Sequence, residues 1–205
     1  MTIQRYTFHE RICHWLTGLT YCYCLATGLA FYSPWLFWMA IVLGGGPVSR
    51  FWHPFVGLVF LAAAIWMHGL WRSDMSITPI DREWLDQAGN YATNNNDDAV
   101  PPQGRFNAGQ KVFYWAMFYG ALLLLISGLV LWFPERVPVG ARWIRSFAIL
   151  LHESAALITI GAFIIHVYMG VFVVPGSVKA IVNGEVSADW ARTHHRLWYD
   201  RITGR

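Results

Sequence analysis

The histidines are the residues of this sequence whose type and placement best suit chemistry. The eight are His9, His14, His53, His68, His152, His166, His194 and His195. Five of them, from His14 to His166, lie in or at the ends of long apolar stretches, where an ionisable side chain is costly and indicates function. A lone histidine there often only bonds a neighbouring helix, so the argument depends on the arrangement. The other three lie in polar segments and are expected to be solvated.

Two of the histidines share one predicted helix. His152 and His166 are fourteen residues apart. Fourteen steps of about 100° return to within about 40° of the starting direction, and they advance about 21 Å along the axis. One helix therefore presents two imidazoles on the same face, near its opposite ends.

Four apolar stretches are long enough to cross about 30 Å of hydrocarbon and to position these rings. We predict membrane spans at about residues 12–32, 53–71, 111–133 and 147–174. Aromatic residues crowd the ends of these spans, as is typical of a membrane interface. Residues 34–43 are apolar but short, which predicts a helix lying in the interface. The first span lacks a cleavage signal behind it and is expected to be retained.

Chain direction then pairs the histidines by depth. His14 begins the first span and His166 ends the fourth, so both lie near one surface; His53 and His152 both lie near the other. Each pair can hold one six-coordinate haem iron through neutral imidazole nitrogens. His68 lies near the same surface as His14 and is the alternative partner of His166, but it is rotated further from its partner.

Composition agrees with a membrane protein. Of 205 residues, 56% are hydrophobic and 13% charged, about half the charged share of a soluble domain. The net charge of +3 forms no basic stripe, so nucleic-acid binding is not expected. Cys13, Cys22 and Cys24 are read as small buried hydrophobic residues, and the sequence has no CxxCH motif for covalent haem attachment.

Lysine and arginine residues set the expected orientation. With four spans, the two termini share a side with the loop at residues 72–110. That side holds Arg5, Arg11, Arg72, Arg82, Arg105, Lys111, Lys179, Arg192, Arg196, Arg201 and Arg205, and the other side holds Arg50, Arg136, Arg142 and Arg145. The bias predicts that both termini are cytoplasmic.

Two polar segments complete the predicted single domain, residues 1–205. The middle of the loop, GNYATNNNDDAVPPQG, is rich in turn residues and is predicted to be a solvent loop. The tail at 175–205 is predicted to form two helical pieces, the second capped by Ser187.

These residues resemble one known family, the cytochrome b (gamma) subunits of membrane-bound, quinone-linked formate dehydrogenases. The resemblance covers nearly the whole chain. It is carried by RICHW, FWHPFVG, FNAGQK, LLHESAA and the segment from IIHVYMG to HHRLWY. The histidine spacing alone would also suit cytochrome b subunits of hydrogenases. The departures are the Asn-rich stretch at 90–105, Glu153 directly after His152, and His68.

The resemblance implies specific roles. His14 and His166 would ligate the cytoplasmic-side haem, and His53 and His152 the far-side haem. An iron–sulfur beta subunit, fed by a molybdenum- or tungsten-dependent alpha subunit that oxidises formate, would supply electrons. A quinone, menaquinone or ubiquinone, would accept them in a pocket involving Asn107, Gly109 and Gln110. Read without the resemblance, Asn107 and Gln110 equally suit helix capping at the start of the third span.

The expected protein is thus an all-α integral membrane protein of the bacterial inner membrane, a four-helix bundle with two b-type haems and a polar helical tail. No nucleophile triad, phosphate loop or iron–sulfur cysteine cluster occurs, so the chain is not expected to oxidise formate by itself. The rival readings are a cytochrome b subunit of another oxidoreductase and a haem-free membrane anchor or transporter.

Overall fold

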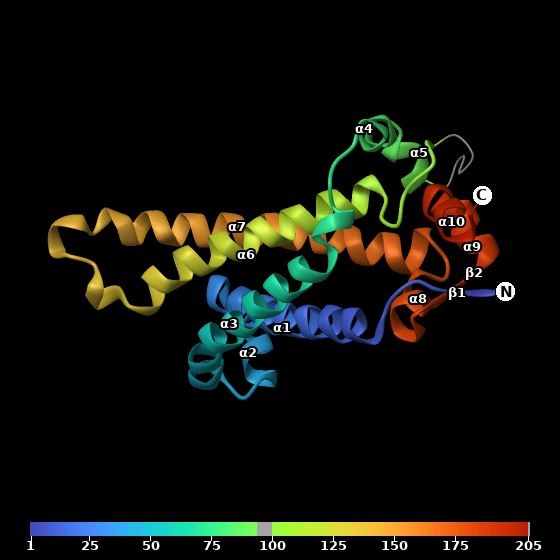
Figure 1. The fold of residues 1–205 in the computed structure, drawn as a ribbon. Coiled ribbons are helices and arrows are strands. Elements are labelled where there is room, and N and C mark those ends of the chain that lie inside the picture. Colours follow the sequence, from blue (N-terminus) through green and yellow to red (C-terminus); the bar gives the residue numbers. More distant parts are fainter. Residues whose placement is uncertain (94–99, 205) are drawn as a thin grey trace. The chain divides into compact units, whose positions relative to one another are not determined.

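The computed structural model describes residues 1–93 and 100–204, which form a helical protein with four long helices, α1, α3, α6 and α7 (Figure 1). The main elements are β1 (Thr2–Gln4), α1 (Phe8–Tyr32), α2 (Trp38–Val42), α3 (Gly46–Trp71), α4 (Pro79–Asp86), α5 (Ala88–Ala92), α6 (Ala108–Trp132), α7 (Trp143–Tyr168), α8 (Ser177–Asn183), β2 (Glu185–Ser187), α9 (Ala188–His194) and α10 (Arg196–Thr203). Short 3₁₀ turns lie at Pro34–Leu36, Arg72–Asp74, Pro134–Arg136 and Val139–Ala141, and a π-helical turn, Met169–Val173, follows α7.

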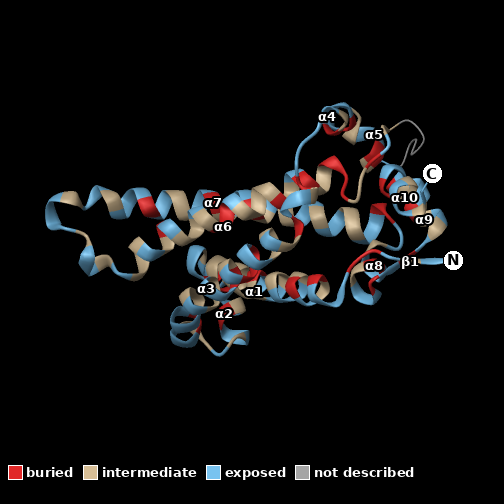
Figure 2. Cartoon of the chain, in the orientation of Figure 1, coloured by how far each residue is buried: buried red, intermediate tan, exposed pale blue. Residues whose placement is uncertain are grey.

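Each predicted span coincides with a long helix. Three segments of the described chain are long and apolar enough to cross a membrane: Gly46–Asp74, Ala108–Trp132 and Trp143–Val173. Their apolar windows are only 22%, 17% and 11% buried, and Figure 2 shows many exposed and half-buried residues along these helices. Such apolar surface suits lipid. Helix α1 is also long, with 25 residues. Its threonines, glycines and tyrosines make it less apolar than the other three helices, so its hydropathy is too low for a candidate span.

Contacts divide the chain into two compact units. The first comprises Met1–Arg11, His68–Ala116 and Ala162–Arg205, and the second comprises Ile12–Met67 and Met117–Gly161. In the second unit, the ring of Tyr21 packs on that of Phe60, with centroids 5.6 Å apart. The Cys13 thiol lies 3.4 Å from the carbonyl oxygen of Ala63. Cys13 is buried, whereas Cys22 is exposed and Cys24 half-buried, so the prediction of three buried cysteines is correct only for Cys13.

In the first unit, the N-terminal strand pairs with the tail. β1 and β2 are antiparallel, with Thr2 opposite Ser187 and Gln4 opposite Glu185. Gly184, which precedes β2, has a φ of 89°, and its carbonyl accepts hydrogen bonds from the amides of Arg5 and Tyr6. A Cβ on Gly184 would lie 2.8 Å from the carbonyl oxygen of Tyr6, so both the conformation and the close approach require glycine.

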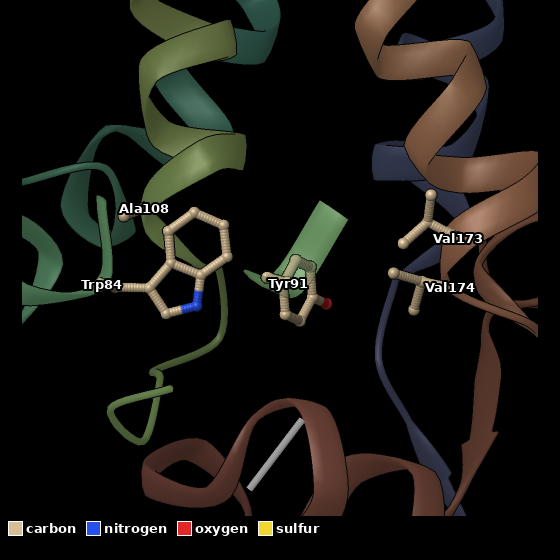
Figure 3. Close-up of a cluster of buried hydrophobic side chains, with 5 residues drawn as sticks. All are labelled: Trp84, Tyr91, Ala108, Val173 and Val174. Carbon is tan, nitrogen blue, oxygen red and sulfur yellow. The ribbon is translucent and has the colours of Figure 1, made fainter. Parts of the chain in front are cut away.

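The predicted solvent loop, residues 89–104, is helical at its start, which corrects the sequence expectation. Ala88–Ala92 is helical and Tyr91 is buried, and Pro79–Asp86, in the same connection before the loop, is helical as well. Trp84 and Tyr91 pack in one apolar cluster with Ala108, Val173 and Val174 (Figure 3). Residues 94–99 of the predicted loop lie outside the described residues. In the tail, Ser187 caps α9 as predicted, because its hydroxyl accepts a hydrogen bond from the Trp190 amide, whereas strand β2 was not expected.

Candidate functional site

The second unit brings His53 of α3 and His152 of α7 together. Their ring centroids are 6.4 Å apart and their planes are inclined at 57°. An imidazole nitrogen lies about 2 Å from a metal that it ligates, so one metal ion between two rings separates their centroids by roughly 6 Å. The observed distance therefore suits two imidazoles on opposite sides of one ion.

Each ring is held on its other nitrogen by a hydroxyl group. The Oγ1 atom of Thr27 lies 2.7 Å from Nδ1 of His53. The Oγ atom of Ser127 lies 2.9 Å from Nδ1 of His152. Both hydroxyl residues are buried, at 0% and 1% exposure. These contacts leave Nε2 as the ring nitrogen that is able to ligate a metal.

A glycine follows each hydroxyl residue and lies against the same ring. A Cβ on Gly28 would lie 3.7 Å from Cε1 of His53, and one on Gly128 would lie 3.4 Å from Cε1 of His152. A methyl group at either position would lie in contact with the imidazole, so the two glycines leave that side of each ring open.

The pair fits a cofactor that brings ligands of its own. No group of three or more His, Cys, Asp or Glu side chains in residues 1–93 and 100–204 is placed to hold a bare metal ion. Two imidazoles supply two ligands, and a haem macrocycle supplies four in its plane. His53 and His152 would thus supply two nitrogen ligands to a haem iron.

The two residues of the other predicted pair, His14 and His166, belong to different units, so their pairing stays a prediction. His14 belongs to the second unit and His166 to the first. The ring of His166 stacks on Phe113, with centroids 4.2 Å apart. The alternative ligand, His68, has its Nδ1 atom 2.5 Å from the Tyr114 hydroxyl and packs against Trp115.

Asn107 and Gln110 form a reciprocal cap at the start of α6. The Gln110 side-chain oxygen accepts from the Asn107 amide at 3.0 Å, and the Asn107 side-chain oxygen accepts from the Gln110 amide at 2.9 Å. Gly109 lies against Trp84, whose ring would be 3.3 Å from an added Cβ. The capping role considered for these amides is therefore realised. It uses their oxygens and leaves their NH₂ groups as hydrogen-bond donors.

A buried ion pair lies beside this cap. The ammonium of Lys111 donates to both carboxylate oxygens of Asp81, at 2.9 and 2.8 Å. Burial alone would raise the pKa of Asp81, but hydrogen bonds from Lys111 and Thr78 outweigh it and hold that pKa below its ordinary value of 3.8. The pair joins α4 to α6.

The structure corrects the expectation for one of the three remaining histidines. His9 is exposed and His194 half-buried, but His195 is only 2% exposed. Its Nδ1 atom lies 2.7 Å from the Gly104 carbonyl, and its Nε2 atom lies 2.9 Å from a guanidinium nitrogen of Arg5. Burial and the adjacent Arg5 charge hold the pKa of His195 well below 6.5. His195 is therefore a buried neutral residue that joins the tail to the N-terminal arm.

Sequence reasoning missed Thr27, Ser127 and Asp81. The usable signal for the first two was a hydroxyl residue directly before a glycine in each of two spans, Thr27-Gly28 and Ser127-Gly128. For Asp81 the signal was its position three residues after Thr78, because the two form a capping box at the start of α4.

The chain is similar to known proteins over nearly its whole length. Residues 5–184 match the prokaryotic cytochrome b561 family. The chain is 34% identical to the cytochrome b556(fdo) subunit of formate dehydrogenase from Escherichia coli K12, over 98% of this chain and 93% of that protein. It is 31% identical to the cytochrome b556(Fdn) subunit of the nitrate-inducible enzyme of that strain, over 98% and 91%. For the formate dehydrogenase cytochrome b556 subunit of Haemophilus influenzae, the identity is 30% over 96% and 82%. These matches confirm the resemblance drawn from the motifs.

Proposed function

The chain belongs to the prokaryotic cytochrome b561 family, and from this membership we propose that it is the di-haem cytochrome b subunit of a formate dehydrogenase complex. Membership makes it a membrane cytochrome b that carries electrons. The proposal adds that the electrons come from an iron–sulfur subunit and pass to a quinone. Its relatives are named as subunits of formate dehydrogenases, which supports this partnership. The formate-oxidising site would lie on a molybdenum- or tungsten-containing subunit.

The observation that carries the proposal is the His53–His152 pair, with its ring centroids 6.4 Å apart. Haem b, when bound, takes up and releases one electron at a time at its iron. The two histidines would hold the far-side haem through one ring nitrogen each. The glycines at 28 and 128 keep the flanks of both rings clear, and the apolar helices exclude water.

The second haem of the proposal uses His14 and His166, near the cytoplasmic surface. Its support comes from the sequence: His166 follows His152 by fourteen residues on one helix, and His14 lies near the start of the first predicted span. This arrangement also requires α1 to cross the membrane as a fourth span. Haem analysis of His14→Ala and His68→Ala separates the two candidate ligands. We expect His14→Ala to lose one haem and His68→Ala to keep both, and the reverse result would assign the site to His68.

The quinone would bind where α6 begins. The NH₂ groups of Asn107 and Gln110 are suited to donate hydrogen bonds to a quinone carbonyl, and Gly109 leaves room for the Trp84 ring beside them. The nearby Lys111–Asp81 pair is polar and buried. This end of α6 lies on the side rich in lysine and arginine, which we place in the cytoplasm, with both termini, at the bacterial inner membrane.

Rapid-mixing spectroscopy of the purified complex tests the proposal. Formate should reduce the b-type absorption band, and a quinone analogue should reoxidise it. The variant Asn107→Ala should slow only the reoxidation, whereas His53→Ala should impair reduction of the remaining haem. A band that hydrogen reduces and formate does not would assign the chain to a hydrogenase complex. A complex without a b-type band would indicate that the chain is a haem-free membrane anchor or transporter.

A further inference from the structure

We propose that Thr27 and Ser127 are positioning residues that hold His53 and His152 in the one tautomer that ligates iron. The proposal rests on the proposed function, because it assumes that these histidines bind the far-side haem. It concerns which ring nitrogen carries the proton, how each ring is oriented, and thereby the potential of that haem.

The hydrogen bonds of Thr27 determine the direction of its contact with His53. A hydroxyl has one hydrogen to donate. The Thr27 hydroxyl donates it to the backbone, where the Tyr23 carbonyl oxygen lies at 2.8 Å and that of Cys24 at 3.2 Å. Towards His53 the hydroxyl can then only accept, so Nδ1 of His53 carries the hydrogen and Nε2 does not.

Ser127 repeats this arrangement on α6. Its hydroxyl donates to the Leu123 carbonyl oxygen at 2.6 Å. It therefore accepts from Nδ1 of His152, which lies 2.9 Å away. Both hydroxyl residues are almost fully buried, so water does not replace either contact. Two helices thus fix the same tautomer in two different rings.

The glycine beside each hydroxyl adds a second constraint. Gly28 lies against Cε1 of His53 and Gly128 against Cε1 of His152. The hydroxyl and the glycine of one helix therefore meet two adjacent ring atoms, Nδ1 and Cε1. Rotation of either ring about its Cβ–Cγ bond would break its hydrogen bond. The two hydroxyl groups therefore hold the ring planes at their inclination of 57°.

The hydrogen bond also affects the iron. Donation from Nδ1 makes Nε2 more basic, and a more basic axial ligand stabilises the oxidised iron relative to the reduced iron. Loss of a hydroxyl should therefore raise the midpoint potential of the far-side haem. We expect the oxidised-to-reduced equilibrium to change by up to about tenfold, which is about 59 mV for one electron.

Redox titration of the intact complex tests this inference. The variants Thr27→Val and Ser127→Ala remove one hydroxyl each, and Thr27→Ser retains it. Thr159→Val is the matched control, because Thr159 is a buried threonine of the same unit whose hydroxyl donates to the Ala156 carbonyl. Thr27→Val and Ser127→Ala should raise the potential of one b-type component, and Thr159→Val and Thr27→Ser should leave it unchanged. The electron paramagnetic resonance signal of the oxidised far-side haem should shift in the first two variants, because it reports ring orientation.

Two results would overturn the inference. One is a wild-type potential and resonance signal in both Thr27→Val and Ser127→Ala. The other is an equal change in Thr159→Val. If Thr27→Val loses the haem outright, retention of a wild-type haem in Thr27→Ser supports the inference, and its loss there as well contradicts it. Failure of the proposed haem site is separate: it would show as retention of both haems in His53→Ala.

Discussion

Lys111 donates hydrogen bonds to both carboxylate oxygens of Asp81, and the two residues are 7% and 1% exposed. The bond joins α4 to the first turn of α6, next to the cap formed by Asn107 and Gln110. Removing one partner of a buried pair leaves the other charge uncompensated, which costs about 3–5 kcal/mol. The position of the candidate quinone residues therefore depends on a helix that lies in the connection between two spans.

We expect Asp81→Ala to destabilise the first unit by about that amount, because Lys111 would remain buried without its carboxylate. Thermal unfolding and protease cleavage between α4 and α6 would report the loss. Asp189→Ala is the control: Asp189 also pairs with an arginine, but its side chain is 88% exposed, so little change is expected. Equal effects of the two variants would refute a special role for the buried pair.

Docking of the tail should weaken in mild acid. His195 titrates near 6.5 when unfolded, but its folded pKa lies well below that value, because of burial, Arg5 and His194. Between these two values only the unfolded tail binds the proton. The docked tail is therefore most stable above about pH 6.5. Below that value its docking equilibrium constant falls by up to about tenfold for each pH unit.

Protease cleavage of the tail, compared at about pH 7.5 and about pH 5.5, measures this dependence. His195→Gln should dock less well at both values but lose most of the difference between them. His9→Gln, which alters an exposed histidine, should behave like the wild type. A wild-type tail equally resistant at both values would contradict the buried neutral state of His195.

Gly120→Ala should disturb the packing of α6 on α7 in the second unit. A Cβ on Gly120 would lie 2.4 Å from Cγ2 of Thr159, a short and buried side chain, so one of the two helices must shift. Overpacking of this kind costs about 1–3 kcal/mol, seen as a lower Tm. Gly161→Ala on α7 meets nothing within 4 Å and should leave Tm unchanged or slightly higher. A tolerated Gly120→Ala would show that the two helices can separate without cost.

Much of the fold follows from local sequence features. The runs around Leu122–Leu125 and Ile158–Ile165 are long and apolar, so α6 and α7 could be predicted from length and hydropathy alone. Helices α4 and α5 were missed because polar residues dominate their segment. The strand pairing of Thr2 with Ser187 joins residues far apart in the sequence, which local patterns do not reveal.

In the candidate site, too, some residues could be predicted from local sequence and others could not. The five histidines of the apolar stretches attract attention because ionisable residues are rare in such segments. Thr27 and Ser127 do not, because a hydroxyl in a helix commonly bonds the carbonyl four residues earlier and both also do so. Their second role depends on which ring the neighbouring helix brings to them. For the same reason, the burial of His195 was not predictable without its partner Arg5.

Sidedness gives a prediction for the complex in proteoliposomes. If quinone is reduced near Asn107–Lys111, electrons cross most of the membrane from the far-side haem, and protons are taken up on the cytoplasmic side. Formate and quinone should then build a potential that is negative on the quinone side, with about 2.3 kcal/mol stored per charge at 100 mV. Turnover without a potential would place the quinone site near His53 and His152 instead.

The most direct test of the two-haem proposal is the haem content of the purified complex, measured as the pyridine haemochrome. We predict two haems b per chain in the wild type and one in His53→Ala, with His9→Ala as a control that keeps both. One haem or none in the wild type, or two in His53→Ala, would contradict it.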